Sequence, residues 1–228
     1  MDNGEISFIM QTNSVLDKIK RESPFSNFVD FSLPIPKTFK GSNEIRLIIL
    51  GQDPTVERKE SRKNVKVVLN LDKSNALRKY VEEICNFLNV GIEYVFATNC
   101  VKNYFVDPPT KIISEFPRGV FPLVEFIKFW LPNLKEELSD YKNVPTILLG
   151  QPILRAVISE NQNPNMRYYW GYDKSWRSGM TKEFHLIQRC DNILNRKIFP
   201  FPHQPCISRN KYYQSRFEDY IQFMRDNT

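Results

Sequence analysis

The chain has 228 residues, 41% of them hydrophobic and 25% charged, a composition that is ordinary for a globular protein. A chain of this length can bury one substantial core, which favours a single domain over residues 1–228. It contains no apolar run long enough to cross a membrane, and no cationic N-terminal segment that leads into a long apolar one. We therefore expect a cytoplasmic protein that makes no contact with a membrane.

The formal net charge of +6 suits an anionic partner such as nucleic acid, although a moderate positive excess also serves solubility alone. The four cysteines, Cys85, Cys100, Cys190 and Cys206, lie in separate segments and show no CxxC spacing. We therefore expect reduced thiols, with neither a disulfide framework nor a metal site. No tail or second interface stands out, so a monomer is expected.

The first half of the chain alternates helical patterns with short apolar runs. A helix is predicted over residues 14–22, and the prolines of the following stretch (FSLPIPKTF) keep it extended. Continuous apolar runs predict strands over residues 45–50, 65–71 and 94–99. Between the last two, Ser74 is a candidate N-cap for a helix over residues 75–89.

The second half continues this alternation. The predicted elements are a helix within residues 122–141 that Pro132 interrupts, a strand over 146–150, a helix from Pro152, a polar and aromatic surface loop over 161–178, a fourth strand from either 184–188 or 197–201, and an amphipathic helix over 212–226.

Strands that alternate with helices predict an α/β fold, here a three-layer α/β/α arrangement around a central, mainly parallel four-stranded sheet. Ligands of such sheets bind outside the carboxyl ends of the strands. The short polar elements GQDPT, TN, GQP and HQPCIS each follow an apolar, strand-like run. We therefore expect these four elements to converge at one edge of the sheet.

Those elements carry a resemblance to a known family. ILGQDPT (residues 49–55) resembles the first active-site motif of family 1 uracil-DNA glycosylases, and HQPCIS (203–208) resembles the second. VFATN (95–99) resembles the strand that ends in the base-reading asparagine of that family, and ILLGQ (147–151) the strand before its Gly-Ser loop. The resemblance covers roughly residues 45–224 and implies a monofunctional DNA glycosylase that uses water and no cofactor.

The resemblance gives Asp53 and His203 the catalytic roles. A carboxylate beside the sugar can stabilise an oxocarbenium-like transition state, and a neutral imidazole can donate a hydrogen bond to the departing base. The alternatives are that Asp53 only closes an Asx turn and that His203 is structural. The second histidine, His185, lies inside an apolar run and is expected to be structural.

The same resemblance assigns Gln52, Thr55, Leu69 and Asn99 to the pocket for a base that is flipped out of DNA. The amide of Asn99 can be turned to match either uracil or cytosine, so it indicates a pyrimidine without choosing between the two. Its alternative role is to cap a turn at the end of its strand.

The resemblance also implies that several further residues bind the DNA backbone. Gly150 and Gln151 would offer backbone N–H groups to a phosphate, although a glycine after a strand needs no such reason. Ser208, Arg209 and Lys211 would contact phosphates, or would form a solvated face of the loop.

Ile207 aligns with the family's leucine that enters the base stack as the target base leaves. An apolar side chain in a polar, basic loop has little structural reason to be there, whereas wedge insertion is a known use of Ile and Leu. The sequence therefore predicts that Ile207 inserts into DNA.

The chain departs from the family at the base pocket. Thr55 and Val56 replace a tyrosine and a histidine, and Leu69 replaces an aromatic ring that stacks on uracil. The tyrosine excludes thymine, so its loss favours a C5-modified pyrimidine as the target. Such a target would fit defence against phage DNA that carries hypermodified cytosine, or removal of damaged bases, while uracil remains the alternative.

The alternative hypothesis is that the chain is a catalytically inactive DNA-binding protein on the same scaffold. Retention of Asp53, Asn99 and His203 together favours the enzyme, because a decaying site has no reason to keep all three. Two aromatic and basic segments, residues 104–121 and 167–176, have no family counterpart. They would either line a DNA channel or pack as ordinary structure.

Overall fold

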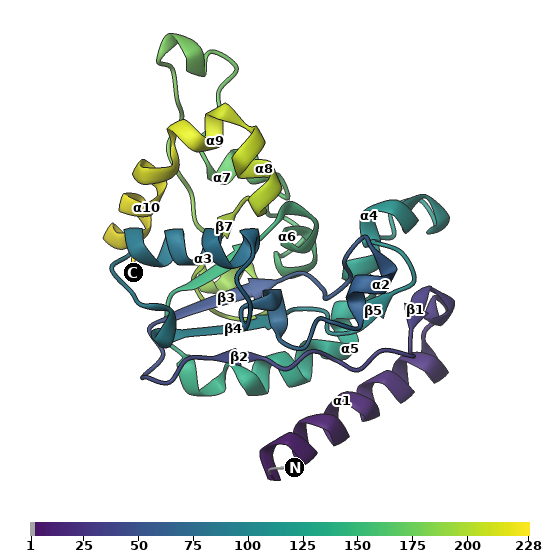
Figure 1. The fold of residues 1–228 in the computed structure, drawn as a ribbon. Helices are drawn as coiled ribbons and strands as arrows, with labels where there is room; N and C mark the ends of the chain where they lie inside the picture. The colour runs from purple at the N-terminus through teal and green to yellow at the C-terminus, as the bar shows by residue number, and fades with distance from the viewer. Residues whose placement is uncertain (1–2) are drawn as a thin grey trace.

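The computed structural model describes residues 3–228, and Figure 1 shows how its helices and strands are arranged. Five strands form the central sheet: β2 (Phe39–Lys40), β3 (Leu47–Gly51), β4 (Val95–Asn99), β6 (Thr146–Leu149) and β7 (Ile198–Phe201). Their spatial order is β2-β4-β3-β6-β7. The last four strands in this order run parallel, whereas β2 pairs antiparallel with β4 at the edge. The predicted α/β class and mainly parallel sheet are therefore confirmed.

The sheet has five strands instead of four because the extended stretch after the first helix contributes β2. A separate two-stranded sheet pairs β1 (Val29–Asp30) with β5 (Tyr104–Phe105). Of the two candidates for the last parallel strand, residues 197–201 form β7. Residues 184–188 make only one bridge, between Ile187 and Ile198.

Helices lie on both sides of the sheet, with α3 above it and α5 below it in Figure 1. No helix in the described part of the chain has the length and apolar character needed to cross a membrane. The helices span Asn3–Glu22 (α1), Lys59–Arg62 (α2), Ala76–Phe87 (α3), Pro109–Ile112 (α4), Pro122–Glu137 (α5), Gln151–Val157 (α6), Met166–Tyr169 (α7), Gln204–Arg209 (α8), Lys211–Ser215 (α9) and Phe217–Asp226 (α10).

The strands are buried on both faces, as their continuous apolar runs predicted. Every residue of β3, β4, β6 and β7 is buried, including Thr98 and Asn99 at the end of β4. Because side chains alternate between the two faces of a strand, each strand packs against helices on both sides. The burial holds the ends of the strands in place, and the polar residues that follow them are positioned by the same core.

The predicted strand over residues 65–71 is wrong. This segment contains a single 3₁₀ turn, Val68–Asn70, in which Leu69 and Asn70 have positive φ angles of 58° and 50°. The edge of the sheet next to β4 is already taken by β2, and a backbone with positive φ cannot extend a strand. Among the described residues, the segment has one ladder contact, an isolated bridge between Lys37 and Val67.

Helix boundaries also differ from the prediction. The first helix is longer than residues 14–22, and α3 is capped by Asn75 instead of Ser74. The Asn75 side chain accepts hydrogen bonds from the backbone N–H groups of Leu77 and Arg78. Pro132 does not interrupt α5, because it lies on the exposed side, where water can satisfy the carbonyl that proline leaves unpaired.

The segment 161–178 is not simply a surface loop. It contains α7, and Tyr169 and Trp170 are buried at 1% and 0% exposure. The predicted C-terminal helix is divided at Arg216 into α9 and α10.

Candidate active site

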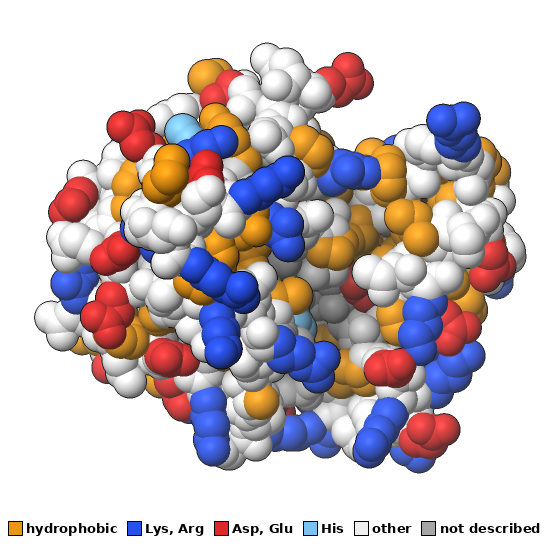
Figure 2. All heavy atoms as spheres, turned by 90° about the horizontal axis from the view of Figure 1, so that it is seen from above, with side chains coloured by type: hydrophobic (Ala, Val, Ile, Leu, Met, Phe, Trp, Pro, Cys, Tyr) orange, Lys and Arg blue, Asp and Glu red, His pale blue; other side chains and the backbone are white. Residues whose placement is uncertain are grey.

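The four polar elements converge as predicted. Asp53 follows β3, Asn99 ends β4, Gly150 follows β6 and His203 follows β7, so all four lie at the carboxyl ends of neighbouring parallel strands. The strands β3 and β7 are separated by β6 alone, which places their ends about 9–10 Å apart. Figure 2 shows a hollow in the face seen from above, with hydrophobic side chains inside it and Lys and Arg side chains around it.

Asp53 is a half-buried residue in a tight turn. The backbone N–H of Thr55 donates a 2.8 Å hydrogen bond to its Oδ1, so the Asx turn considered as an alternative is present. Burial raises the pKa of Asp53 to about 6, against the opposing effects of the Thr55 hydrogen bonds and the charge of Arg62. The carboxyl group is therefore mostly ionised at neutral pH and becomes protonated under mildly acidic conditions.

Asn99 carries a buried acceptor without a partner. The residue is 1% exposed, and its Oδ1 has no hydrogen-bond partner in the described structure. A Cβ atom on Gly51 would lie 2.3 Å from this oxygen and 2.9 Å from Cδ2 of Leu69. Gly51 thus lets the amide of Asn99 and the Leu69 side chain approach the end of β3 closely. An unsatisfied buried acceptor is costly, which makes it a natural point for a ligand donor.

A buried ion pair anchors the backbone around Asn99. Lys102 is 3% exposed, and its Nζ donates to Glu137 Oε2 at 2.8 Å and to Thr98 Oγ1 at 2.6 Å. The same Nζ lies 3.5 Å from the carbonyl oxygen of Asn99. The pair joins the end of β4 to the end of α5, so the position of Asn99 depends on both elements.

Thr55 and Gln52 hold the loop after β3 in place. The Thr55 Oγ1 accepts a 2.8 Å hydrogen bond from the backbone N–H of Phe105, and the Gln52 carbonyl accepts one of 2.9 Å from Val101. The Gln52 side chain covers Gly150, where a Cβ atom would lie 2.2 Å from its Nε2. Both residues of the predicted base pocket therefore also have structural roles.

The structure corrects the prediction for Gly150. Its backbone N–H donates a 2.8 Å hydrogen bond to the carbonyl of Phe201, so this group is not available to a phosphate. Glycine is needed there because φ is +103°, where an L side chain is strained, and a Cβ atom would also displace the Gln52 amide. Gln151 uses its side-chain Oε1 to accept a hydrogen bond of 3.3 Å from the backbone N–H of Met166.

His203 lies where β7 passes into α8. Its carbonyl accepts hydrogen bonds from the N–H groups of Cys206 and Ile207, and the Tyr80 hydroxyl donates a 2.9 Å bond to the preceding Pro202 carbonyl. The imidazole is half-buried, and burial lowers its pKa below the usual value. The ring is therefore neutral at pH 7 and can donate a hydrogen bond from one nitrogen.

The placement predicted for Ile207 is wrong. Residues 204–209 form helix α8 instead of an exposed loop, and Ile207 is only 8% exposed. It lines a cavity of about 420 Å³ together with Tyr80 and Phe217. The side chain therefore has a packing role. Beyond it, Arg209 and Lys211 are exposed, and the carbonyl of Ser208 accepts a bond from the Gln214 side chain.

His185, which was expected to be structural, stacks on Tyr168 with ring centroids 4.3 Å apart. The nearby aromatic segment 167–176 is core only in part, since Tyr169 and Trp170 are buried whereas Tyr168 is exposed. Trp170 stacks on Tyr220 at 4.2 Å, and its Nε1 donates a 2.8 Å hydrogen bond to the Pro200 carbonyl.

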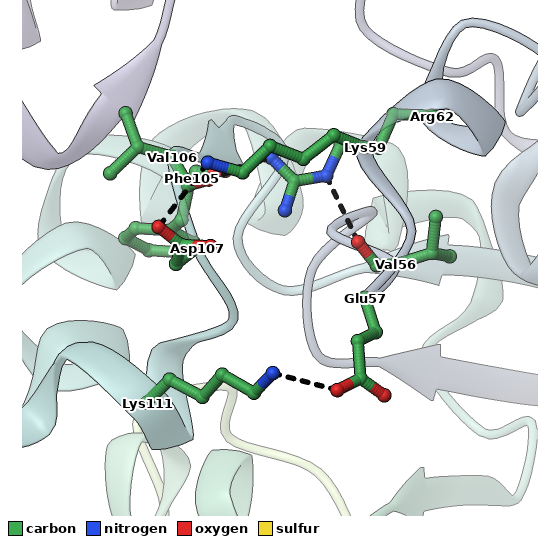
Figure 3. Close-up of polar contacts among 8 residues, drawn as sticks. All are labelled: Val56, Glu57, Lys59, Arg62, Phe105, Val106, Asp107 and Lys111. Atoms are coloured by element: carbon green, nitrogen blue, oxygen red, sulfur yellow. Dashed lines mark hydrogen bonds and ion pairs between the residues drawn. The ribbon is translucent and has the colours of Figure 1, made fainter.

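Sequence reasoning missed Arg62, which is 2% exposed and joins two loops at the site (Figure 3). Its Nε donates to the Val56 carbonyl at 2.9 Å, and its Nη1 donates to the carbonyls of Phe105 and Val106 at 2.8 and 3.0 Å. The loop that carries Asp53 is thereby fixed to the segment after β5. Arg62 lies in the polar run RKESRK, which resembles any solvated surface, so the sequence holds no sign of this role.

Two ion pairs at the surface support the same junction. Lys111 Nζ lies 2.6 Å from Glu57 Oε1, and Lys59 Nζ lies 3.4 Å from Asp107 Oδ2 (Figure 3). All four side chains are substantially exposed, so each pair contributes little stability. The segment 104–121, whose role the sequence left open, therefore forms one wall beside the Asp53 loop.

A cavity of about 450 Å³ adjoins the site between α4, α5, α6 and α8. Its lining includes Phe121, Gln151, Arg155 and Cys206, and the Arg155 guanidinium lies 4.1 Å from the centre of the Phe121 ring. A flat cation against an aromatic ring is a surface on which a nucleobase can stack.

Comparisons with known proteins assign no family to the chain. The sequence matches no protein-family model, and no curated protein matches it significantly.

Proposed function

We propose that this chain is a monofunctional DNA glycosylase with a uracil-DNA-glycosylase-like three-layer fold. The observation that carries the proposal is Asp53, a half-buried carboxyl group with a raised pKa directly after a central parallel strand. Perturbed ionisable groups of this kind are concentrated at functional sites. The unpaired oxygen of Asn99, at the end of the adjacent strand β4, and the neutral ring of His203, after β7 at the same end of the sheet, support it further.

In the proposed reaction, water attacks the sugar C1′ of a flipped pyrimidine nucleotide. The bond between C1′ and the base nitrogen breaks, and its electron pair leaves with the base. The Asp53 carboxylate stabilises the cationic sugar and orients the water. The proton that the water loses as the new C–O bond forms ends on the departing base, which leaves as the neutral free base. His203 donates a hydrogen bond to the base oxygen on which negative charge develops. The products are an abasic site and the free base.

The proposed target is a C5-modified pyrimidine, with uracil as the alternative. Thr55 is small and its hydroxyl is bonded to the backbone of Phe105, which supports a pocket without a large barrier beside C5. The cavity of about 450 Å³ beside the site offers room for a substituent or a neighbouring base. The rival function is DNA binding without cleavage on the same scaffold.

The proposal is tested by cleavage of single- and double-stranded oligonucleotides. They contain uracil, thymine, 5-hydroxymethylcytosine or glucosylated hydroxymethylcytosine, and alkali-labile abasic sites are counted. Asp53→Asn and His203→Ala should abolish cleavage while DNA binding persists. The matched control is Asp17→Asn, which removes one exposed carboxylate from α1 and should cleave like the wild type. Binding without cleavage on every substrate would favour the non-catalytic function.

A further inference from the structure

A cluster of positive charge lies at the edge of the sheet opposite to the candidate active site. A cavity of about 230 Å³ there is lined by four cationic side chains and by no Asp or Glu. The cations come from three segments: Lys135 from α5, Lys142 from the turn before β6, and Arg189 and Arg196 from the stretch before β7. In a parallel sheet, the residues that precede the strands and the residues that follow them lie at opposite ends of the sheet. This cavity is lined by residues that precede β6 and β7, whereas Asp53 follows β3, so the two sites are distinct.

The cations of this cavity lack anionic partners. In the part of the chain that the structure describes, none of the four takes part in an ion pair. Arg189 donates a 3.1 Å hydrogen bond to the Asn143 side chain, which is neutral. Four positive charges around one small cavity repel each other, and an anion placed between them would remove that repulsion.

Arg196 is the most informative member of the cluster. It is only 4% exposed, and its Nη2 donates to the Tyr141 carbonyl. Its Nε and Nη1 are buried and have no hydrogen-bond partner within the described structure. Burial and the nearby charge of Arg189 lower the pKa of Arg196 to about 10, which leaves it charged at neutral pH. A buried guanidinium with two unused donors is costly unless a ligand accepts from them.

The surrounding structure holds Arg196 in this position. The Asn192 side chain donates hydrogen bonds to the carbonyls of Arg196 and Gln188, at 2.8 and 2.7 Å, and so fixes the turn before β7. Leu138 and Leu194 supply the apolar part of the lining. The cavity is therefore built around one buried arginine, whereas its other three cations are exposed.

The size of the cavity limits what it can hold. Pockets for whole drug-sized ligands have volumes of about 300–1,000 Å³, so about 230 Å³ suits a smaller group. Arginine and lysine side chains together recognise tetrahedral oxyanions, because the guanidinium donates two parallel bonds and the ammonium adds a compact charge. A phosphate group fits the size, the charge and the donors.

We propose that this cavity is a phosphate-binding site, in which Arg196 and Arg189 donate hydrogen bonds to the oxygens and Lys135 and Lys142 complete the charge. The phosphate group belongs either to a small free anion or to a nucleic-acid backbone that passes the end of the sheet where β6 and β7 begin. This site does not depend on the proposed glycosylase activity.

The test is calorimetric titration of the full chain with pyrophosphate at constant ionic strength. Saturable binding is expected for the wild type. The double variant Lys142→Ala/Arg189→Ala removes two exposed cations of the site and should weaken binding at least about tenfold. The matched control Lys18→Ala/Arg21→Ala removes two exposed cations from α1 and should bind like the wild type. Arg196→Met is a further variant, but its buried position makes the exposed pair the safer test of the site.

Two results would overturn the proposal. One is the absence of saturable pyrophosphate binding to the wild type, and the other is an equal loss in both double variants, which would mean a general effect of charge. Titration with an unmodified DNA duplex separates the two sources of phosphate. Weaker duplex binding by the Lys142/Arg189 variant than by the control indicates a nucleic-acid backbone, and equal duplex binding indicates a small free anion. Because base cleavage is not measured, failure of either proposal leaves the other testable.

Discussion

Replacing Asp53 by asparagine should stabilise the fold while it abolishes cleavage. The pKa of this carboxyl group rises from 3.8 to about 6 because folding buries it. Such a difference between unfolded and folded states corresponds to about 2–3 kcal/mol of destabilisation once the group is ionised. Asparagine has nearly the same shape, and its oxygen can still accept the hydrogen bond that the Thr55 N–H donates. The variant therefore avoids the cost of the buried charge and keeps the turn.

Proton binding by Asp53 determines whether the free energy of unfolding rises or falls with pH. Between about pH 4 and pH 6 the folded protein holds the Asp53 proton more tightly than the unfolded chain, so wild-type stability decreases as the pH rises through this range. Above about pH 6 the loss is complete. The stability gain of Asp53→Asn should therefore be about 2–3 kcal/mol at pH 8 and close to zero below about pH 4.

Urea unfolding of both proteins at the two pH values measures this difference directly. A gain that is the same at pH 4 and pH 8 would refute an origin in the buried charge, and so would a loss of stability at pH 8. The activity of the wild type provides a second measurement. If the carboxylate is the active form, the rate at pH 5 should be about one-tenth of its plateau, because a group with a pKa of about 6 is then about one-tenth ionised.

Three further predictions concern residues around the site. Arg62→Ala leaves three backbone carbonyls without their donor and should lower the free energy of unfolding by about 3 kcal/mol or more, measured in urea, with a parallel loss of cleavage. Gly150→Ala places a Cβ atom against the Gln52 amide at a φ of +103° and should cost at least about 2 kcal/mol; unchanged stability would contradict the observed packing. The double variant Lys174→Ala/Arg177→Ala removes two exposed cations from the segment between α7 and residue 184. If both cations contact phosphates, the variant should lower the slope of the logarithm of the DNA-binding constant against the logarithm of the salt concentration by up to about 2, measured by titration at several salt concentrations. An unchanged slope would exclude the segment from the interface.

The central strands could be predicted from the sequence because burial on both faces leaves a continuous apolar run. Residues 45–50, 94–99 and 146–150 have such runs, and each forms a strand within one or two residues of the predicted bounds. Since parallel strands end at the same edge, the convergence of the polar elements followed from the strand order of the chain. The residues that end those strands could therefore be named in advance.

The same reasoning failed where apolar residues are buried for another reason. Residues 65–71 are as apolar as a strand, but Leu69 is placed beside Gly51 and Asn99 by a backbone with positive φ. Ile207 seemed to lie in a basic loop, yet it is buried in α8 and lines a cavity together with Tyr80 and Phe217. Apolar character predicts burial in both cases, but it does not identify the neighbour.

Buried charged residues were the hardest to predict from the sequence. Arg62 and Arg196 are each surrounded in sequence by polar residues, and both are buried by segments far away along the chain. Arg62 contacts residues 105 and 106, and Arg196 contacts Tyr141. The local sequence of a charged residue predicts exposure, because burial of its charge requires partners that only the folded chain brings together.

The sequence by itself determined the α/β class, the parallel strands and the edge where Asp53, Asn99 and His203 gather, because these depend on the hydrophobic pattern and on chain order. The tertiary structure alone decided how these residues behave. Burial raises the pKa of Asp53 and lowers that of His203, and the buried Asn99 Oδ1 has no hydrogen-bond partner among the described residues. The tertiary structure also brings four cations that are distant in the sequence to one cavity. Desolvation and the distance between charges depend on the three-dimensional arrangement of the chain, which the local sequence does not contain.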